Sequence, residues 1–268
     1  MLAPAPQLSQ AAGAGWLAAG ASAIGTSHLA DDKPCQDAHG LRVLPGGALL
    51  AAVSDGAGSA ERSEVGSRLA VDTLLEFLEL SLETGAPADD EGWAALLRNG
   101  FATAAEALAC EAAERGLPLR QLSATLLVAV VHPQRTVFAS VGDCVAVAQE
   151  TGGAWQLPIK PARGEYANET TFLTSPGWLA QLLVEFLPAP PHRVALFSDG
   201  LLRLALNLAA ATPHAPFFDS LFAFLTSQPS LEETVAALGQ FLESDRVNAR
   251  TDDDKSLLVA WRPPAAAE

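Results

Sequence analysis

The sequence predicts an α+β fold in which antiparallel strands pack with amphipathic helices. Two apolar runs, 124–131 and 136–141, are separated by the turn His132-Pro133-Gln134, a pattern typical of a β-hairpin. Antiparallel neighbours joined by short turns exclude a doubly wound parallel sheet for this half of the chain. Residues 63–83 and 93–108 carry leucine and aromatic side chains at helical spacing, so we expect two core helices that form one layer.

Composition sets the size of the core and limits the partners. The chain has 268 residues, 49% of them hydrophobic, which is enough for one large core, and we favour one domain over two. A formal net charge of −15 argues against binding to nucleic acid or to an anionic membrane. Three cysteines without Cys-x-x-Cys spacing favour a reduced, cytoplasmic location, and we interpret them as small buried hydrophobic residues.

The two ends of the chain carry no strong pattern. Residues 1–15 are rich in Ala and Pro and resemble neither a signal peptide nor a membrane span, so we expect a disordered leader. The small and apolar residues from 16 to 26 are compatible with a strand or a helix. We expect one domain over 16–262 and a frayed tail over 263–268.

Two apolar runs end in the same Ser-Asp-Gly motif. The first, 49–53, leads to Asp55, and the second, 194–197, leads to Asp199. Each pattern predicts a buried strand that delivers a carboxylate into a turn, although an ordinary turn also explains Asp-Gly after an apolar run.

More acidic residues stand where strands begin or turn, namely Asp37, Asp143 and the run Asp252-Asp253-Asp254. Clustered carboxylates repel one another and are costly to desolvate, so a buried group of them implies a compensating cation. Oxygen ligands suit Mg²⁺ or Mn²⁺ better than zinc.

At these residues the chain resembles the metal-dependent protein phosphatases, the type 2C serine/threonine family, in its bacterial branch. The resemblance extends from about Trp16 to Trp261 and rests on motifs in the family's order. These motifs are Gly25-Thr26-Ser27-His28 with Cys35-Gln36-Asp37-Ala38, Val53 to Ser59, Ser123 to Leu127 with Val141-Gly142-Asp143, Phe197 to Leu201, and Asp253 to Leu257. The resemblance implies a four-layer α-β-β-α sandwich, two antiparallel sheets flanked by helical pairs, and it favours a strand over 16–26.

The resemblance also assigns the site. It implies two Mn²⁺ or Mg²⁺ ions, with Asp55 bridging them and the Gly56 carbonyl on one of them. Asp199 and Asp253 complete the other, Asp37 acts directly or through water, and Asp143 is a candidate for a third, weaker ion. Asp252 and Asp254 stay open as alternatives to Asp253, because a register error of one residue is easy there.

Two positions depart from the family pattern. Many members have a histidine after Asp-Gly, where this chain has Ala57, and the family's phosphate-binding arginine corresponds to Asp32. An acid there repels phosphate, so another cation has to take that role. Lys33, His28 and Arg62 are the candidates. For each, a solvated surface residue is the alternative, and His28 can equally orient its loop through a hydrogen bond.

Two further segments complete the chain. Region 152–191 is rich in proline, and we interpret it as a variable flap-like region beside the active site, with a plain surface loop as the alternative. Ser230 with Glu233 forms a capping box that predicts a helix start, and this helix pairs with one over 216–226 to form the second helical layer. Residues 256–261 form the last strand.

The predicted function is hydrolysis of phosphoserine and phosphothreonine in proteins by water activated between two metal ions, without a covalent intermediate. The partners are then a phosphorylated protein and a cognate serine/threonine kinase, and we expect a monomer. Two alternatives stay open: a catalytically silent binding or sensor module with the same fold, and a hydrolase of small phosphate esters.

Overall fold

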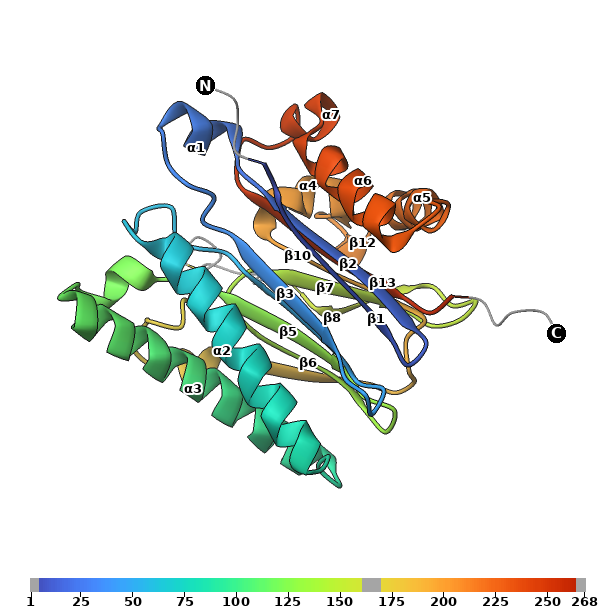
Figure 1. The fold of residues 1–268 in the computed structure, drawn as a ribbon, viewed down its shortest axis with the longest axis horizontal. Helices are drawn as coiled ribbons and strands as arrows, with labels where there is room; N and C mark the ends of the chain where they lie inside the picture. The colour runs from blue at the N-terminus through green and yellow to red at the C-terminus, as the bar shows by residue number, and fades with distance from the viewer. Residues whose placement is uncertain (1–4, 161–169, 264–268) are drawn as a thin grey trace.

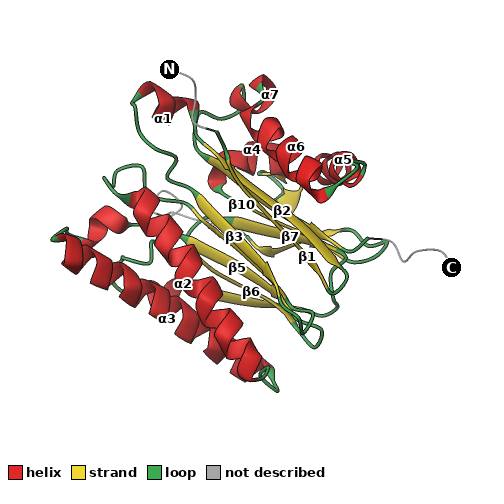
Figure 2. Cartoon of the chain, in the orientation of Figure 1, coloured by secondary structure: helices red, strands yellow, loops and turns green. Residues whose placement is uncertain are grey.

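Two antiparallel sheets form the centre of the molecule (Figures 1 and 2). The computed structural model describes residues 5–160 and 170–263. The six-stranded sheet has the order β1-β2-β13-β10-β7-β8, and the five-stranded sheet has the order β3-β4-β5-β6-β9. The strands of the first are β1 (Gln7–Gly13), β2 (Trp16–Ala23), β13 (Lys255–Trp261), β10 (Arg193–Phe197), β7 (Val145–Gln149) and β8 (Trp155–Ile159). Those of the second are β3 (Ala38–Val43), β4 (Leu49–Ser54), β5 (Leu126–Val131), β6 (Thr136–Val141) and β9 (Leu183–Leu187).

Helices cover the outer face of each sheet, which confirms the predicted four-layer sandwich. α2 (Ser63–Thr84) and α3 (Asp90–Arg115) bury one hydrophobic cluster against the five-stranded sheet. α5 (Ala215–Thr226) and α6 (Leu231–Glu243) bury a second cluster against the six-stranded sheet. A third cluster fills the space between the two sheets. Figure 1 shows the two helical layers on opposite sides of the sheets.

Short elements connect these layers. They are α1 (Thr26–Ala30), α4 (Leu202–Ala205), α7 (Asp245–Asn248), the small strands β11 (Leu206–Asn207) and β12 (Thr212–Pro213), and the 3₁₀ turns η1 (Leu119–Leu122), η2 (Trp178–Gln181) and η3 (Asp199–Leu201).

The predicted end of α3 and the predicted start of α6 are confirmed, whereas α3 begins at Asp90, three residues before the predicted Trp93. α3 stops at Gly116, which has φ 65° and closes the helix in the left-handed conformation that glycine tolerates best. The hydroxyl of Ser230 accepts a hydrogen bond of 3.1 Å from the backbone N–H of Glu233, so the predicted cap of α6 is confirmed.

Several expectations are wrong. Residues 7–13, assigned to a disordered leader, form β1, which pairs with β2 through the tight turn Ala14-Gly15. Backbone hydrogen bonds hold this strand, and they leave no signal in an Ala-rich sequence. Region 152–191 is more regular than its prolines suggested, because it contains β8 and β9, the edge strands of the two sheets, and its flap-like role stays a prediction. α1 was not predicted. Of the three cysteines only Cys144 is buried, because Cys110 is exposed and Cys35 is partly exposed.

Parts of three predicted segments lie outside the described residues: the start of the leader, 161–169 of the flap-like region, and most of the tail. Within the described residues, no helix combines the length and apolar character needed to cross a bilayer.

Candidate metal centre

In the five-stranded sheet, two acidic residues meet because their strands are antiparallel neighbours. β3 begins at Ala38 and β4 ends at Ser54, and these two residues are partners in the ladder. Asp37 therefore precedes the start of β3 at the same end of the sheet where Asp55 follows β4.

The six-stranded sheet brings three more acids together by the same rule. The end of β10, Phe197, pairs with Val145 near the start of β7 and with Leu257 near the start of β13. Asp199 follows β10, Asp143 precedes β7 and Asp253 precedes β13, so all three lie at one end of this sheet.

A buried hydrogen bond joins the acidic end of the five-stranded sheet to that of the six-stranded sheet. The Ser198 hydroxyl, next to Asp199, donates to Asp37 Oδ2 over 2.6 Å, and both side chains are buried. The other oxygen of Asp37, Oδ1, is buried and has no hydrogen-bond partner among the described residues. The acidic ends of the two sheets thus form one site.

Asp55 is fixed by its own backbone. Its N–H donates to the Thr125 hydroxyl over 2.9 Å, and its carbonyl accepts from the Thr125 N–H over 2.8 Å. The next residue must be glycine, because a Cβ on Gly56 would lie 2.6 Å from the Gln36 carbonyl oxygen and 2.8 Å from Ser63 Cβ. The turn after β4 therefore holds the carboxylate of Asp55 in one direction.

The carboxylates raise one another's pKa. Burial raises the pKa of Asp55 well above its ordinary value, and the charges of Asp37, Asp199, Asp143 and Asp253 raise it further. Burial also raises the pKa of Asp37, with help from Asp254. Burial, Asp143 and Asp253 raise the pKa of Asp199 to about 6. Acids from five separate parts of the chain are therefore close enough to disfavour the ionised forms of Asp37, Asp55 and Asp199.

The donor set fits hard divalent cations. The available ligands are carboxylate and carbonyl oxygens, and the Oδ1 atoms of Asp37 and Asp143 are buried without a partner in the described part of the chain. As they stand, no three His, Cys, Asp or Glu side chains among the described residues are arranged to hold a metal ion. Mg²⁺ commonly keeps several waters and uses one or two carboxylates, so a looser carboxylate set is compatible with it.

The structure distinguishes the three consecutive acids before β13. Asp254 is buried, and its Oδ1 accepts from the Gly25 N–H over 2.6 Å. Its Oδ2 accepts from the Gln36 N–H over 2.6 Å and lies 2.9 Å from His28 Nδ1. These bonds occupy Asp254 in holding loops. Asp253 is exposed, and its charge raises the pKa of Asp55 and Asp199. Asp252 is equally exposed and lines a cavity together with Asp199 and Asp253.

The three candidate phosphate-binding residues contact groups other than the proposed metal ligands. His28 is buried against Asp254, which matches its alternative role of orienting the loop. Lys33 forms an exposed ion pair with Asp31 at 3.6 Å, and Arg62 one with Glu64 at 3.5 Å. Among the described residues, no hydrogen bond or ion pair joins these three cations to the carboxylates named above as metal ligands.

Sequence reasoning missed several residues that shape the site. Ser198 and Thr125 bind the backbone or carboxylates of the acids, and both lie inside motifs that were already quoted. The Thr170 hydroxyl donates to Asp143 Oδ2 over 2.6 Å, so one described end of the flap-like region reaches the site. Arg203 and Arg250 line a cavity together with Asp199 and Asp253, and no sequence pattern indicated them.

Comparison with known proteins decides the family. The sequence profile of protein phosphatase 2C matches residues 24–243. The chain belongs to the protein phosphatase 2C family. It is 36% identical over 251 residues to serine/threonine-protein phosphatase 3 of Escherichia coli (strain K12), covering 91% of this chain and 98% of that protein.

Solved structures share the fold of this phosphatase 2C chain. PppA, described as a key regulatory component of T6SS in Pseudomonas aeruginosa, has 20% identity and a TM-score of 0.60, covering 92% of this chain and 97% of PppA. The catalytic domain of the serine threonine protein phosphatase PstP, solved with two manganese ions, has 18% identity and a TM-score of 0.56, over 92% of this chain and 97% of that one.

These findings confirm the predicted family and fold. They support dephosphorylation of serine and threonine in proteins as the activity, and they give no support to a silent module or a small-ester hydrolase.

Proposed function

We propose that this chain hydrolyses phosphoserine and phosphothreonine esters in proteins with Mn²⁺ or Mg²⁺, by direct attack of water and without a covalent intermediate. One observation carries the proposal: two sheets deliver Asp37, Asp55, Asp143, Asp199 and Asp253 to one end, where their charges raise the pKa values of Asp37, Asp55 and Asp199. Such a cluster is unfavourable without cations and favourable with them.

The ligand roles are those that the family resemblance implies, and the convergence of the acids supports them. We propose that Asp55 and the Gly56 carbonyl would hold one ion, and that Asp55, Asp199 and Asp253 would hold the other. Asp37 acts directly or through water, and its Oδ2 is oriented by Ser198. Bound divalent ions supply charge neutralisation and lower the pKa of a water that attacks phosphorus.

The remaining residues position this set. Thr125 and the close approach at Gly56 fix the Asp55 turn. Thr170 holds Asp143, which we assign to a third, weaker ion. Asp254 ties the loops of Gly25 and Gln36 to the start of β13.

The test measures hydrolysis of a phosphothreonine peptide and of a small aryl phosphate with Mn²⁺. We expect EDTA, Asp55→Asn or Asp199→Asn to abolish both activities. Asp72→Asn is the matched control, because Asp72 is an exposed acid on α2. A metal-free preparation that retains the full rate contradicts the proposal.

Metal stoichiometry has its own measurement. Calorimetric titration with Mn²⁺ should show two tight sites and a weaker third that is lost in Asp143→Asn. Dependence on a cognate kinase, a monomeric state and a cytoplasmic location stay predictions, and sedimentation of the purified chain checks the second of these.

A further inference from the structure

Two cavities adjoin each other beside the candidate metal centre. One, of about 510 Å³, is lined by Asp199 and Asp253 together with Arg203 and Arg250. The other, of about 490 Å³, shares Arg203 and Arg250 and continues between α5, α6 and α7. Arg203 and Arg250 line both cavities, so the two meet at these arginines, with carboxylates on one side and aromatic side chains on the other. We refer to the two cavities together as the groove.

Three arginine side chains line the groove. Arg203, Arg246 and Arg250 line it, and none of them forms an ion pair within 4.0 Å in the described part of the chain. Of the nine other arginines in the described residues, six form an ion pair, for example Arg42 with Glu79 and Arg98 with Glu91. Arg120, Arg193 and Arg262 form none within the same residues.

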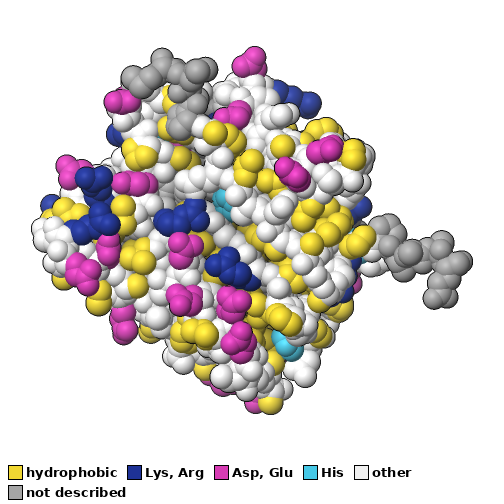
Figure 3. All heavy atoms as spheres, in the orientation of Figure 1, with side chains coloured by type: hydrophobic (Ala, Val, Ile, Leu, Met, Phe, Trp, Pro, Cys, Tyr) yellow, Lys and Arg dark blue, Asp and Glu magenta, His cyan; other side chains and the backbone are white. Residues whose placement is uncertain are grey.

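Several basic side chains on the face that carries α2 lie beside acidic ones (Figure 3). In a chain with 31 acidic and 16 basic residues, carboxylates are abundant. Asp199, Asp252 and Asp253 line the same cavity as Arg203 and Arg250, yet none of them pairs with these arginines. The guanidinium groups are therefore available to an external anion.

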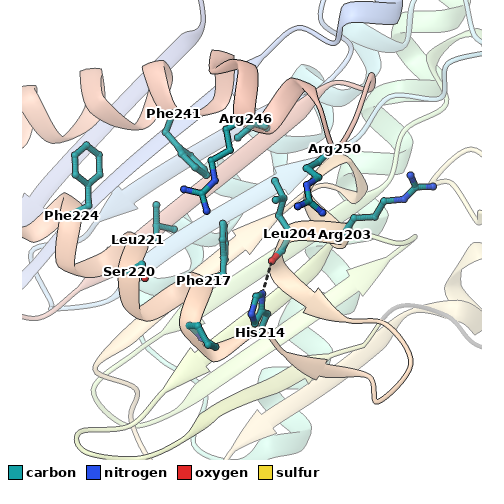
Figure 4. Close-up of a pocket in the computed structure, with 12 residues that line it drawn as sticks. Arg203, Leu204, His214, Phe217, Ser220, Leu221, Phe224, Phe241, Arg246 and Arg250 are labelled. Atoms are coloured by element: carbon teal, nitrogen blue, oxygen red, sulfur yellow. Dashed lines mark hydrogen bonds between the residues drawn. The ribbon is translucent and has the colours of Figure 1, made fainter.

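The far part of the groove is apolar. Phe217, Leu221 and Phe241 line it, and Phe224 lies at its edge with 48% of its surface exposed. Figure 4 shows the Arg246 guanidinium between Phe241 and Phe217, and Arg250 above Leu204. A ligand that fits carries negative charge near the carboxylate end and a bulky apolar side chain further along.

We propose that this groove binds the segment of a phosphoprotein substrate that flanks the phosphorylated residue, and that it selects acidic residues followed by an aromatic or large aliphatic one. The proposal rests on the proposed function, because the reacting phosphate would lie at the carboxylate end. Arg203 and Arg250 then meet the acidic side chains nearest the phosphate, and Arg246 with the phenylalanines binds the residues beyond them.

The groove also supplies positive charge that the expected phosphate-binding positions lack. Asp32 stands where the family resemblance places a phosphate-binding arginine, and Lys33 and Arg62 are paired with acids. Arg203 and Arg250 place positive charge in the cavity that Asp199 and Asp253 also line.

The first experiment does not depend on catalysis. A fluorescein-labelled peptide with glutamates and one phenylalanine, but no phosphate, is titrated with the full chain in EDTA at low salt and followed by anisotropy. We expect Arg246→Gln to weaken binding about tenfold, which corresponds to about 1.4 kcal/mol. Phe224→Ala, at an exposed position, should weaken it several-fold, and a peptide with lysines in place of glutamates should bind far less.

The matched control is Arg98→Gln, a surface arginine on α3 in the other helical layer, which should leave peptide binding unchanged. Equal affinity of wild type and Arg246→Gln overturns the proposal. So does a doubled mass in sedimentation that Arg246→Gln restores to a single chain, because the groove is then an interface between two copies.

The second experiment measures turnover with Mn²⁺. We compare kcat/KM for a phosphothreonine peptide that carries the acidic and aromatic flank with the rate on a small aryl phosphate. The ratio of the first to the second should fall about tenfold in Arg246→Gln. An unchanged ratio overturns the proposal that the groove binds the substrate flank. If neither substrate is hydrolysed while the anisotropy results hold, the phosphatase proposal fails and the groove stands.

Discussion

Asp199→Asn tests the carboxylate cluster through stability as well as activity. Burial and the neighbouring charges of Asp143 and Asp253 raise the pKa of Asp199 from 3.8 to about 6. At pH 7.5 the carboxyl is therefore ionised at a cost of about 3 kcal/mol relative to the unfolded chain. Asparagine carries no charge, so metal-free Asp199→Asn should be about 2–3 kcal/mol more stable than the metal-free wild type.

This advantage should depend on pH in a definite direction. A carboxyl with a raised pKa destabilises the folded state fully above its folded pKa, here about 6, and no longer does so below its unfolded value of 3.8. The difference between Asp199→Asn and the wild type should therefore shrink as the pH falls from 7.5 to 4.

Mn²⁺ should reduce this advantage. A ligand present at a hundred times its dissociation constant stabilises the folded state by about 2.7 kcal/mol, and Asp199→Asn loses part of this gain with its ligand. Urea unfolding at pH 7.5, in EDTA and in Mn²⁺, measures all four free energies, and Asp72→Asn serves as the control within about 0.5 kcal/mol. A variant that is less stable in EDTA, or that gains as much from Mn²⁺ as the wild type, refutes the reasoning.

Three other substitutions test the scaffold. Ser230→Ala removes the N-cap of α6, so we expect a loss of about 1 kcal/mol in urea unfolding with unchanged kcat/KM. Gly200→Ala places a Cβ 2.1 Å from the Asp254 carbonyl oxygen, and we expect the displaced backbone to abolish tight Mn²⁺ binding in calorimetry. Asp254→Asn replaces one accepting oxygen by a donor, so the 2.6 Å hydrogen bonds from the Gly25 and Gln36 N–H groups cannot both survive. The midpoint of thermal unfolding should therefore fall sharply, whereas Ser230→Ala lowers it by only about 2–4 °C.

The helices were predictable because their buried faces repeat at helical spacing. Residues 63–83 became α2, and the residue pattern from Trp93 onward became α3. β1 was not predictable, because backbone pairing with β2 holds it and most of its side chains are exposed. A strand of this kind has neither alternation nor an apolar run to reveal it.

The acidic cluster was predictable for a topological reason. Asp55 and Asp199 each follow an apolar strand, and antiparallel neighbours bring the end of one strand to the start of the next. The roles within Asp252-Asp253-Asp254 were not predictable from three identical residues. Only the burial of Asp254 and its bonds to Gly25 and Gln36 separate a structural acid from a candidate ligand.

The groove arginines could not be predicted at all, because they stand on and beside two four-residue helices, α4 and α7, whose placement depends on the packing of α5 and α6. Their charge has to act locally. The chain carries −15 overall and repels an acidic substrate at long range, but charges are largely screened beyond about 8 Å at physiological ionic strength. Arg203 and Arg250 share their cavity with Asp199, Asp252 and Asp253, so an acidic flank is attracted only where it contacts the guanidinium groups directly. Selectivity for such a flank therefore arises from contact with these arginines and not from long-range steering.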